Sequence, residues 1–342
     1  MIDMTKFKKP FKYIRRKITR PFKWIRMLIK QQFGLLDVPR IVLYRGYGNN
    51  DNVFVRGMVI EDRGLKKPRR KDSILTNMKS MISRYTGDAI PGVAVSIKFN
   101  GNQLNLESDE NGHFGATFPG TAISAEFHPF ADAQIEEQFE DIPEKLIKTR
   151  ENVLIPGQNA EFGVISDIDD TIMISHATQT LKKLRLMLLK NAITRKPFPG
   201  ISAFYHALHR GLSGKAENPF FYVSSSEWNL YDLLDDFMEE NHLPRGVFLL
   251  QDLNHSIFHF WKSGGGNHEH KLIKIKRILK TYKNLPFVLV GDSGQRDPEI
   301  YKKVVDQFPG RIKAVYIRHI KRGWKLRALN GLVEDFKNKG VD

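Results

Sequence analysis

The spacing of apolar residues changes twice along this chain of 342 residues and divides it into regions of different character. The first 39 residues carry apolar side chains at helical spacing among lysines and arginines, as Phe11, Ile14 and Ile18 do. This pattern predicts amphipathic helices. Between residues 40 and 156, apolar and polar residues alternate in short runs separated by Asn-Gly and Asp-Glu-Asn-Gly turns. Alternation with period two between such turns predicts an all-β sandwich.

From residue 157 onward, short and almost continuous apolar runs alternate with helical patterns. The runs predicted to be buried strands are 162–166, 219–224, 286–293 and 312–318, and the predicted helices are 229–240 and 270–282. Apolar strands joined by helices are typical of a parallel sheet covered on both faces. We therefore predict an α/β fold, with a Rossmann-like parallel-sheet domain preceded by the smaller all-β sandwich domain. The predicted parts are an arm (1–39), a β-sandwich domain (40–156), an α/β domain (157–325) and a C-terminal tail (326–342).

Charge is concentrated at the N-terminus. The chain holds 54 lysines and arginines against 38 acidic residues, a formal net charge of +16, and residues 1–30 contribute eleven basic residues and one acid. A basic amphipathic arm suits an anionic membrane surface, where each basic residue contributes about 1 kcal/mol. Aromatic residues interleaved with basic ones also suit single-stranded nucleic acid. From charge alone, both partners remain open.

Two absences narrow the class of protein. There is no cysteine, which excludes disulfides, thiolate zinc sites and a cysteine nucleophile. No apolar stretch reaches the roughly 18 to 20 residues that span a bilayer. The short apolar run 27–29 is bounded by Arg26 and Lys30, so we do not expect a secretory signal. We expect a cytoplasmic protein that associates peripherally with membranes.

Polar side chains follow three of the predicted strands directly. They are Asp167, Asp169, Asp170 and Thr171 after the first strand, Ser224, Ser225 and Ser226 after the second, and Asp292, Ser293 and Asp297 after the third. The carboxyl ends of parallel strands meet at one edge of a sheet, so we expect these groups to converge there. Carboxylates placed together repel one another unless a cation lies among them, and Mg²⁺ prefers such oxygen ligands. A magnesium site in turn favours a phosphate substrate.

Each polar residue has a simpler explanation when it is taken alone. Asp170 or Thr171 could cap a helix, the serines could cap the helix predicted at 229–240, and Asp292 could be a turn residue. Three polar clusters after three apolar runs in one α/β domain favour a functional site over three separate caps.

These residues carry a resemblance to a known family. The stretch "DIDDT" (167–171) resembles the Asp-x-Asp-x-Thr motif of the haloacid dehalogenase (HAD) superfamily of phosphatases, and "FFYVS" (220–224), Lys271 and "GDSGQRD" (291–297) resemble its other motifs. "SDIDDTI", "YVSSSEWNLYDLL", "HKL" and "LPFVLVGDSGQRDPEIY" are similar to the phosphatidate phosphatases typified by the yeast actin-patch protein and its bacterial relatives, over about residues 160–320. Glu227 departs from the proline that this family often has. The resemblance implies an HAD-like fold.

The resemblance also implies a role for each motif residue. Asp167 would be the nucleophile that forms an aspartyl-phosphate, and Asp169 would protonate the leaving alcohol. Thr171 would support the nucleophile loop. The implied Mg²⁺ ligands are Asp167, Asp169 through its main-chain carbonyl, Asp292 and Asp297, and the implied phosphoryl-binding residues are Ser224, Ser225 and Lys271.

The implied activity is Mg²⁺-dependent hydrolysis of phosphatidate to diacylglycerol and phosphate. The segment 174–200 is too short for a large cap domain and predicts a basic amphipathic helix, either an ordinary packing helix or a small lid over the site. With the basic arm, it favours a lipid phosphate at an anionic membrane, and we do not expect nucleic acid to be the partner. The alternatives are an HAD phosphatase for another phosphomonoester, such as a nucleic-acid end or a soluble metabolite, and a non-catalytic membrane-associated interaction protein.

Overall fold

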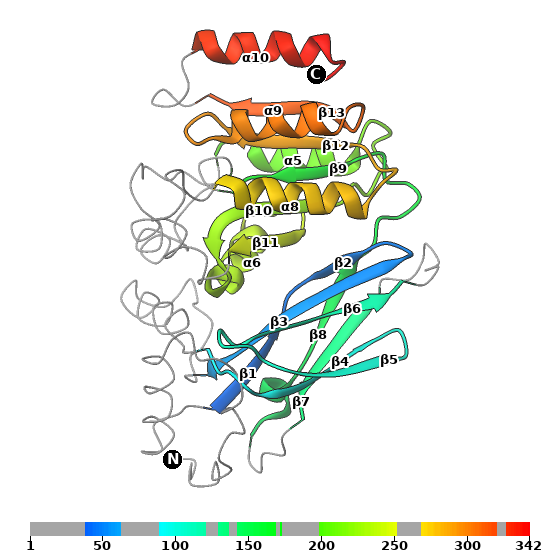
Figure 1. The fold of residues 1–342 in the computed structure, drawn as a ribbon, viewed down its shortest axis with the longest axis vertical. Helices are drawn as coiled ribbons and strands as arrows, with labels where there is room; N and C mark the ends of the chain where they lie inside the picture. The colour runs from blue at the N-terminus through cyan, green and yellow to red at the C-terminus, as the bar shows by residue number, and fades with distance from the viewer. Residues whose placement is uncertain are drawn as a thin grey trace. The chain divides into compact units, whose positions relative to one another are not determined.

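The computed structural model describes residues 38–62, 89–120, 129–136, 142–168, 172, 198–251, 268–319 and 326–342. The predicted arm therefore lies outside the described residues, apart from its last two. The chain forms two compact units (Figure 1). The first unit contains most of the residues up to 152, and the second contains residues 45–53, 119–129 and 153–342. The predicted domain boundaries stay predictions. No helix among the described residues is long and apolar enough to cross a bilayer.

The regular elements in the described part of residues 38–154 are β-strands, apart from one short helix. Its elements are β1 (Val38–Leu43), β2 (Gly46–Gly48), β3 (Asn52–Asp62), β4 (Ala94–Phe99), β5 (Asn102–Glu107), β6 (His113–Pro119), β7 (Phe130–Ile135), α3 (Glu144–Ile147) and β8 (Lys148–Leu154). The strand order is β1-β3-β2-β8-β7-β4-β5, and β6 pairs with β3. The all-β character predicted for this region is present in the described residues, and the sandwich arrangement stays a prediction.

Turn chemistry explains how two neighbouring strands of this region are joined. The hairpin between β4 and β5 turns at Asn100 and Gly101, whose φ angles are 47° and 78°. A two-residue hairpin turn that matches the twist of its strands requires positive φ at both positions, and Asn-Gly satisfies this at low cost. The Asn-Gly signal in the sequence is confirmed at this position.

The second unit is built on a parallel sheet of five strands. Its elements are β9 (Gly163–Ser166), α5 (Ile201–Arg210), β10 (Phe220–Glu227), the 3₁₀ turn η3 (Trp228–Leu230), α6 (Tyr231–Glu240), β11 (Val247–Gln251), α8 (His268–Thr281), β12 (Phe287–Asp292), α9 (Asp297–Gln307), β13 (Ile312–Arg318) and α10 (Leu326–Asn338). The order is β11-β10-β9-β12-β13, and all neighbours are parallel. Helices α8 and α9 lie on one face and α5 lies on the other (Figure 1).

This strand order places a topological switch point at the centre of the sheet. The chain leaves β9 for β10 and β11 on one side, then returns to β12 and β13 on the other. In open α/β sheets, ligands bind at such switch points, outside the carboxyl ends of the strands. Every residue of β9 and of β12 is buried. This explains why their sequences are nearly continuous apolar runs.

The structure confirms the predicted parallel sheet and extends it. All four predicted strands are present, and so are the two predicted helices, as α6 and α8. Strand β11 was not predicted. The predicted tail contains α10, on which Leu329, Leu332 and Phe336 are buried. Their spacing of three and four residues is the amphipathic pattern that could have identified this helix from the sequence.

Candidate active site

Asp167 lies directly after the central strand β9, at the switch point of the sheet. Its main-chain N–H donates to the carbonyl of Val290 on β12 at 2.9 Å, so the residue continues the sheet for one more position. The preceding residue is also fixed, because the hydroxyl groups of Ser166 and Tyr205 are 2.6 Å apart. The side chain of Asp167 is 1% exposed. A buried carboxylate is therefore held at a defined position beyond the strand.

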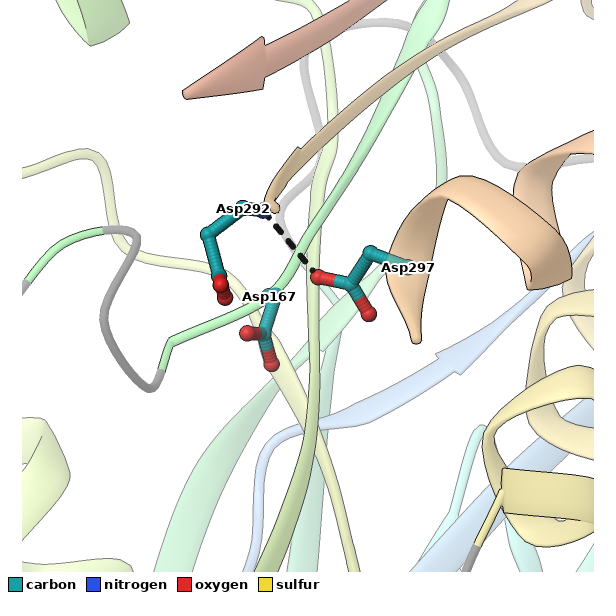
Figure 2. A group of neighbouring side chains, drawn as sticks. All are labelled: Asp167, Asp292 and Asp297. Atoms are coloured by element: carbon teal, nitrogen blue, oxygen red, sulfur yellow. Dashed lines mark hydrogen bonds between the residues drawn. The ribbon is translucent and has the colours of Figure 1, made fainter. Parts of the chain in front are cut away.

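Asp292 ends β12, and Asp297 begins α9 after a short loop. One carboxylate oxygen of Asp292, Oδ1, accepts the N–H groups of Gly294 at 2.5 Å and of Gln295 at 3.1 Å. The main-chain N–H of Asp292 donates to Oδ2 of Asp297 at 3.2 Å (Figure 2). Both side chains are fully buried. These contacts fold the loop back so that both carboxylates face the end of β9.

The three aspartates form one cluster. Each offers a carboxylate oxygen, and these atoms all lie within 4.8 Å of one another. Figure 2 shows that the side chains come from the end of β9, the end of β12 and the start of α9. Three buried negative charges at this separation repel one another strongly unless cations lie among them.

Lys271, on the first turn of α8, supplies one positive charge. Its Nζ is 3.0 Å from Oδ1 of Asp167 and forms a second ion pair with Asp297. Burial alone would lower the pKa of this amine, but the carboxylates of Asp167 and Asp297 raise the pKa of Lys271 well above its ordinary value. Lys271 is therefore charged at neutral pH, and the cluster of three carboxylates and one ammonium keeps a net charge of −2.

The donor set matches a magnesium ion. Mg²⁺ prefers oxygen ligands and is held in proteins by one or two carboxylates together with substrate phosphates and water. A residual charge of −2 on buried oxygen atoms is balanced by one divalent cation. Three of the four predicted ligands, Asp167, Asp292 and Asp297, are thus close enough together to hold one ion, and the fourth, Asp169, lies outside the described residues.

Ser224 lies at the same edge of the sheet, near the end of β10. Tyr222 of β10 is in register with Ser166 of β9, so Ser224 and Asp167 both follow at the carboxyl ends of neighbouring strands. The Ser224 side chain is buried, and its Oγ accepts the N–H of Ser226 at 2.9 Å. Ser225, the other predicted phosphoryl-binding serine, is half-buried.

Lys274 is a neighbour of this edge that the sequence did not single out. Its Nζ donates to the main-chain carbonyl of Ser224 at 3.0 Å. Residues three apart on a helix share a face, so the spacing between Lys271 and Lys274 was a signal that both amines could reach the same edge.

Several predicted site residues lie outside the described residues. They are Asp169 and Thr171, together with their neighbour Asp170 and the greater part of the segment 174–200. The proton-carrier role of Asp169, its contribution to the metal site, the supporting role of Thr171 and the possible lid all stay predictions. Of the predicted catalytic and metal residues, the structure brings Asp167, Lys271, Asp292 and Asp297 into direct proximity.

Gly291 provides a stability test of this packing. A Cβ atom at this position would lie 2.6 Å from Oδ2 of Asp297 and 2.8 Å from the ring of Tyr301. We expect Gly291→Ala to lower the free energy of unfolding by about 1 to 3 kcal/mol, because Asp297 and Tyr301 have to shift. Urea unfolding measures this change.

The matched control for that measurement is Gly331→Ala. Gly331 lies on the exposed side of α10, and a Cβ there meets nothing within 4 Å. The alanine is expected to stabilise the protein by about 0.5 to 1 kcal/mol through helix propensity. If Gly291→Ala stabilised the protein, Asp297 and Tyr301 could not lie as close to Gly291 as described.

Comparisons with known proteins agree with the motifs. Residues 162–319 match the model of the family described as phosphatidate phosphatase APP1, catalytic domain. The phosphatidate phosphatase APP1 of Saccharomyces cerevisiae is 34% identical over 156 residues, which are 46% of this chain and 25% of that protein. An uncharacterized protein of Schizosaccharomyces pombe is 25% identical over 158 residues, again 46% of this chain and 25% of the relative. The resemblance inferred from the motifs is confirmed over this domain.

The extent of these matches is limited to the α/β domain. The chain spans about a quarter of the length of both relatives. Among solved structures, a carbohydrate acetylesterase from Xanthomonas citri is 12% identical, with a TM-score of 0.30 over 82% of this chain and 69% of that chain. A likeness at this level carries no argument about fold or activity.

Proposed function

We propose that this chain is a Mg²⁺-dependent phosphatidate phosphatase with an HAD-like fold, which hydrolyses phosphatidate to diacylglycerol and phosphate. The observation that carries the proposal is the cluster of Asp167, Asp292, Asp297 and Lys271 at the switch point of the sheet, inside a domain that matches a phosphatidate phosphatase family. Such a cluster has the parts that phosphoryl transfer needs, which are a carboxylate nucleophile, a metal site and a fixed cation.

The proposed metal ligands are Asp167, Asp292 and Asp297, with the main-chain carbonyl of Asp169. When bound, Mg²⁺ would neutralise the charge of the phosphoryl oxygens and orient the phosphoryl group toward the nucleophile. Lys271 would take part of the same charge, because its amine is fixed between two of the carboxylates. Mg²⁺ and Lys271 would therefore share the task of neutralising the negative charge of the substrate beside Asp167.

The proposed reaction proceeds in two displacements. A carboxylate oxygen of Asp167 forms a bond to phosphorus while the bond from phosphorus to the diacylglycerol oxygen breaks, and Asp169 gives that oxygen a proton. A water molecule then attacks the phosphorus of the aspartyl-phosphate and gives a proton to Asp169, while the bond between phosphorus and the Asp167 oxygen breaks. This step frees the Asp167 carboxylate and releases phosphate. Ser224, Ser225 and Lys271 would bind the phosphoryl oxygens in both steps.

A lipid substrate is favoured by charge outside the catalytic cluster. Eleven basic residues among the first 30 would hold the chain on an anionic surface, at about 1 kcal/mol for each residue near the membrane before screening by salt. We therefore propose that the protein is cytoplasmic and works while peripherally bound to a membrane. The proposed substrate is then phosphatidate, and the proposed partner is the anionic membrane surface that contains it.

Deletion of residues 1–37 tests the role of the arm, and it ends just before β1. We expect kcat/KM for phosphatidate in anionic vesicles to fall at least about tenfold, because surface attraction is lost, while hydrolysis of p-nitrophenyl phosphate stays within about twofold. Raising the salt concentration should reduce the difference between the two proteins. Equal losses on both substrates would show that the arm has a structural role instead.

A substrate panel decides between the proposed function and its alternatives. Phosphate release is compared for phosphatidate in mixed micelles, glycerol 3-phosphate and an oligonucleotide with a 3′-phosphate. We expect the largest kcat/KM for phosphatidate. A larger kcat/KM for the oligonucleotide or for glycerol 3-phosphate would make that compound's class the proposed substrate in place of the lipid. If none of the three released phosphate, a non-catalytic interaction protein would be favoured.

A further inference from the structure

We propose that Lys274 is a positioning residue for phosphoryl binding, because it holds the main-chain carbonyl of Ser224 and so sets the direction of the Ser224–Ser225 peptide. This inference rests on the proposed function, since it concerns the part of the site that would bind the phosphoryl group. Helix α8 would then have two tasks. Lys271 pairs with the carboxylate cluster, and Lys274 holds the main-chain carbonyl of Ser224 on β10.

The position of Ser224 explains why an outside donor is needed. Strand β10 pairs with β9 as far as Tyr222 and with β11 as far as Val223, and pairing with β11 resumes only at Glu227 after a register shift. Ser224 lies in this irregular stretch, between the paired residues Val223 and Glu227. A buried carbonyl requires a hydrogen-bond donor, and Lys274 Nζ supplies one at 3.0 Å.

Fixing this carbonyl also fixes the next N–H. The described residues contain no cis peptide bond, and in a trans peptide the C=O and the following N–H point in opposite directions. With the Ser224 carbonyl held toward Lys274, the N–H of Ser225 is directed away from Lys274. Lys274 thus decides where the Ser225 donor can meet a phosphoryl oxygen.

The Ser224 side chain is oriented by the same stretch of chain. Its Oγ accepts the N–H of Ser226 at 2.9 Å, which holds the side chain against the same stretch of chain. A rotation of the Ser224–Ser225 peptide would turn the Ser225 N–H while the two Cα atoms stay close to their places. The Ser225 N–H is therefore the donor that depends on the contact between Lys274 and the carbonyl.

The first test measures catalysis with phosphatidate and with p-nitrophenyl phosphate. Lys274→Met is expected to lower kcat/KM about 10- to 100-fold on both substrates, as misplacement of binding groups by fractions of an ångström does. Lys274→Arg retains a donor and is expected to recover activity to within about threefold of the wild type. Lys276→Met removes the same charge from the same helix and is expected to stay within about twofold.

Two catalytic results would overturn the inference. One is a Lys274→Met variant within twofold of the wild type, and the other is an equal loss for Lys276→Met, which would indicate that only the charge of α8 matters. Rescue by arginine but not by a neutral side chain distinguishes positioning through a hydrogen bond from simple packing.

A second measurement does not require hydrolysis. The Ser225 amide resonance is followed by NMR while inorganic phosphate is added in the presence of Mg²⁺. In the wild type we expect this resonance to shift on titration, and in Lys274→Met we expect phosphate to bind at least about tenfold more weakly. Equal binding in both proteins, or no response of the Ser225 amide in the wild type, would overturn the inference. A wild type that binds phosphate at Ser225 but hydrolyses none of the esters would remove the proposed function and leave this inference standing.

Discussion

Asp167→Asn is expected to abolish phosphate release from phosphatidate, with kcat lowered at least about a thousandfold. The amide that replaces the carboxylate is a far poorer nucleophile for phosphorus and a weaker Mg²⁺ ligand, and removal of a nucleophile alone costs most of the catalysis that a site provides. The substitution is nearly isosteric, so the buried position of the side chain is kept. Steady-state phosphate release at saturating Mg²⁺ measures the effect.

The control for this variant is Asp335→Asn. Asp335 lies on α10 and pairs with Lys302 and Lys339 at the surface of the same unit. Removing exposed ion pairs changes stability by about 1 kcal/mol or less, so activity should stay within about twofold. If Asp167→Asn kept more than a tenth of the wild-type kcat, Asp167 would not be the nucleophile.

Lys271→Met is expected to produce the largest loss of stability. It leaves the buried carboxylates of Asp167 and Asp297 without their ammonium partner, and removal of one member of a buried ion pair costs about 3 to 5 kcal/mol. The pKa of Lys271 is raised in the folded protein, so its stabilising charge is fully present below its ordinary pKa of 10.5 and is lost only at higher pH. Urea unfolding at pH 8 in EDTA measures the full effect.

Mg²⁺ should restore part of this stability. A ligand that binds only the folded state stabilises it by about 2.7 kcal/mol at a hundred times its Kd, and the variant no longer has an ammonium that competes for the carboxylates. We expect Lys271→Met to gain more from Mg²⁺ than the wild type does. Lys339→Met is the control, because Lys339 pairs with Asp306 and Asp335 at the surface, where solvent screening makes ion pairs weak, so its loss should change stability far less. Equal losses for the two variants, or no added gain from Mg²⁺, would contradict the arrangement of the cluster.

Much of the second unit could be predicted from the sequence because buried parallel strands leave a clear signal. A strand covered on both faces has to be apolar along its length, and this makes β9, β10 and β12 recognisable. The convergence of Asp167, Asp292 and Asp297 then followed from one rule, that the carboxyl ends of parallel strands share an edge. Lys271 was identified by resemblance to a motif, and the structure gives its physical reason as two ion pairs.

The features that were missed depend on contacts that a local pattern does not contain. Strand β11 is a run of five residues, which periodicity alone does not distinguish from part of a buried helix. The contact of Lys274 with Ser224 joins a helix to a stretch of β10 with a register shift, and neither the shift nor the contact has a signal in the local sequence pattern. Several lysines on α8 look equivalent in sequence, and only the packing of the helix on β10 separates Lys274 from Lys276.

The most direct test of the account is phosphate release from phosphatidate in mixed micelles with Mg²⁺, after addition of EDTA, and after Mg²⁺ is restored. We predict that phosphate release by the wild type stops with EDTA and returns with Mg²⁺. Asp167→Asn should release no phosphate under any of these conditions. Release that continues in EDTA, or a wild type that releases no phosphate when Mg²⁺ is present, would contradict it.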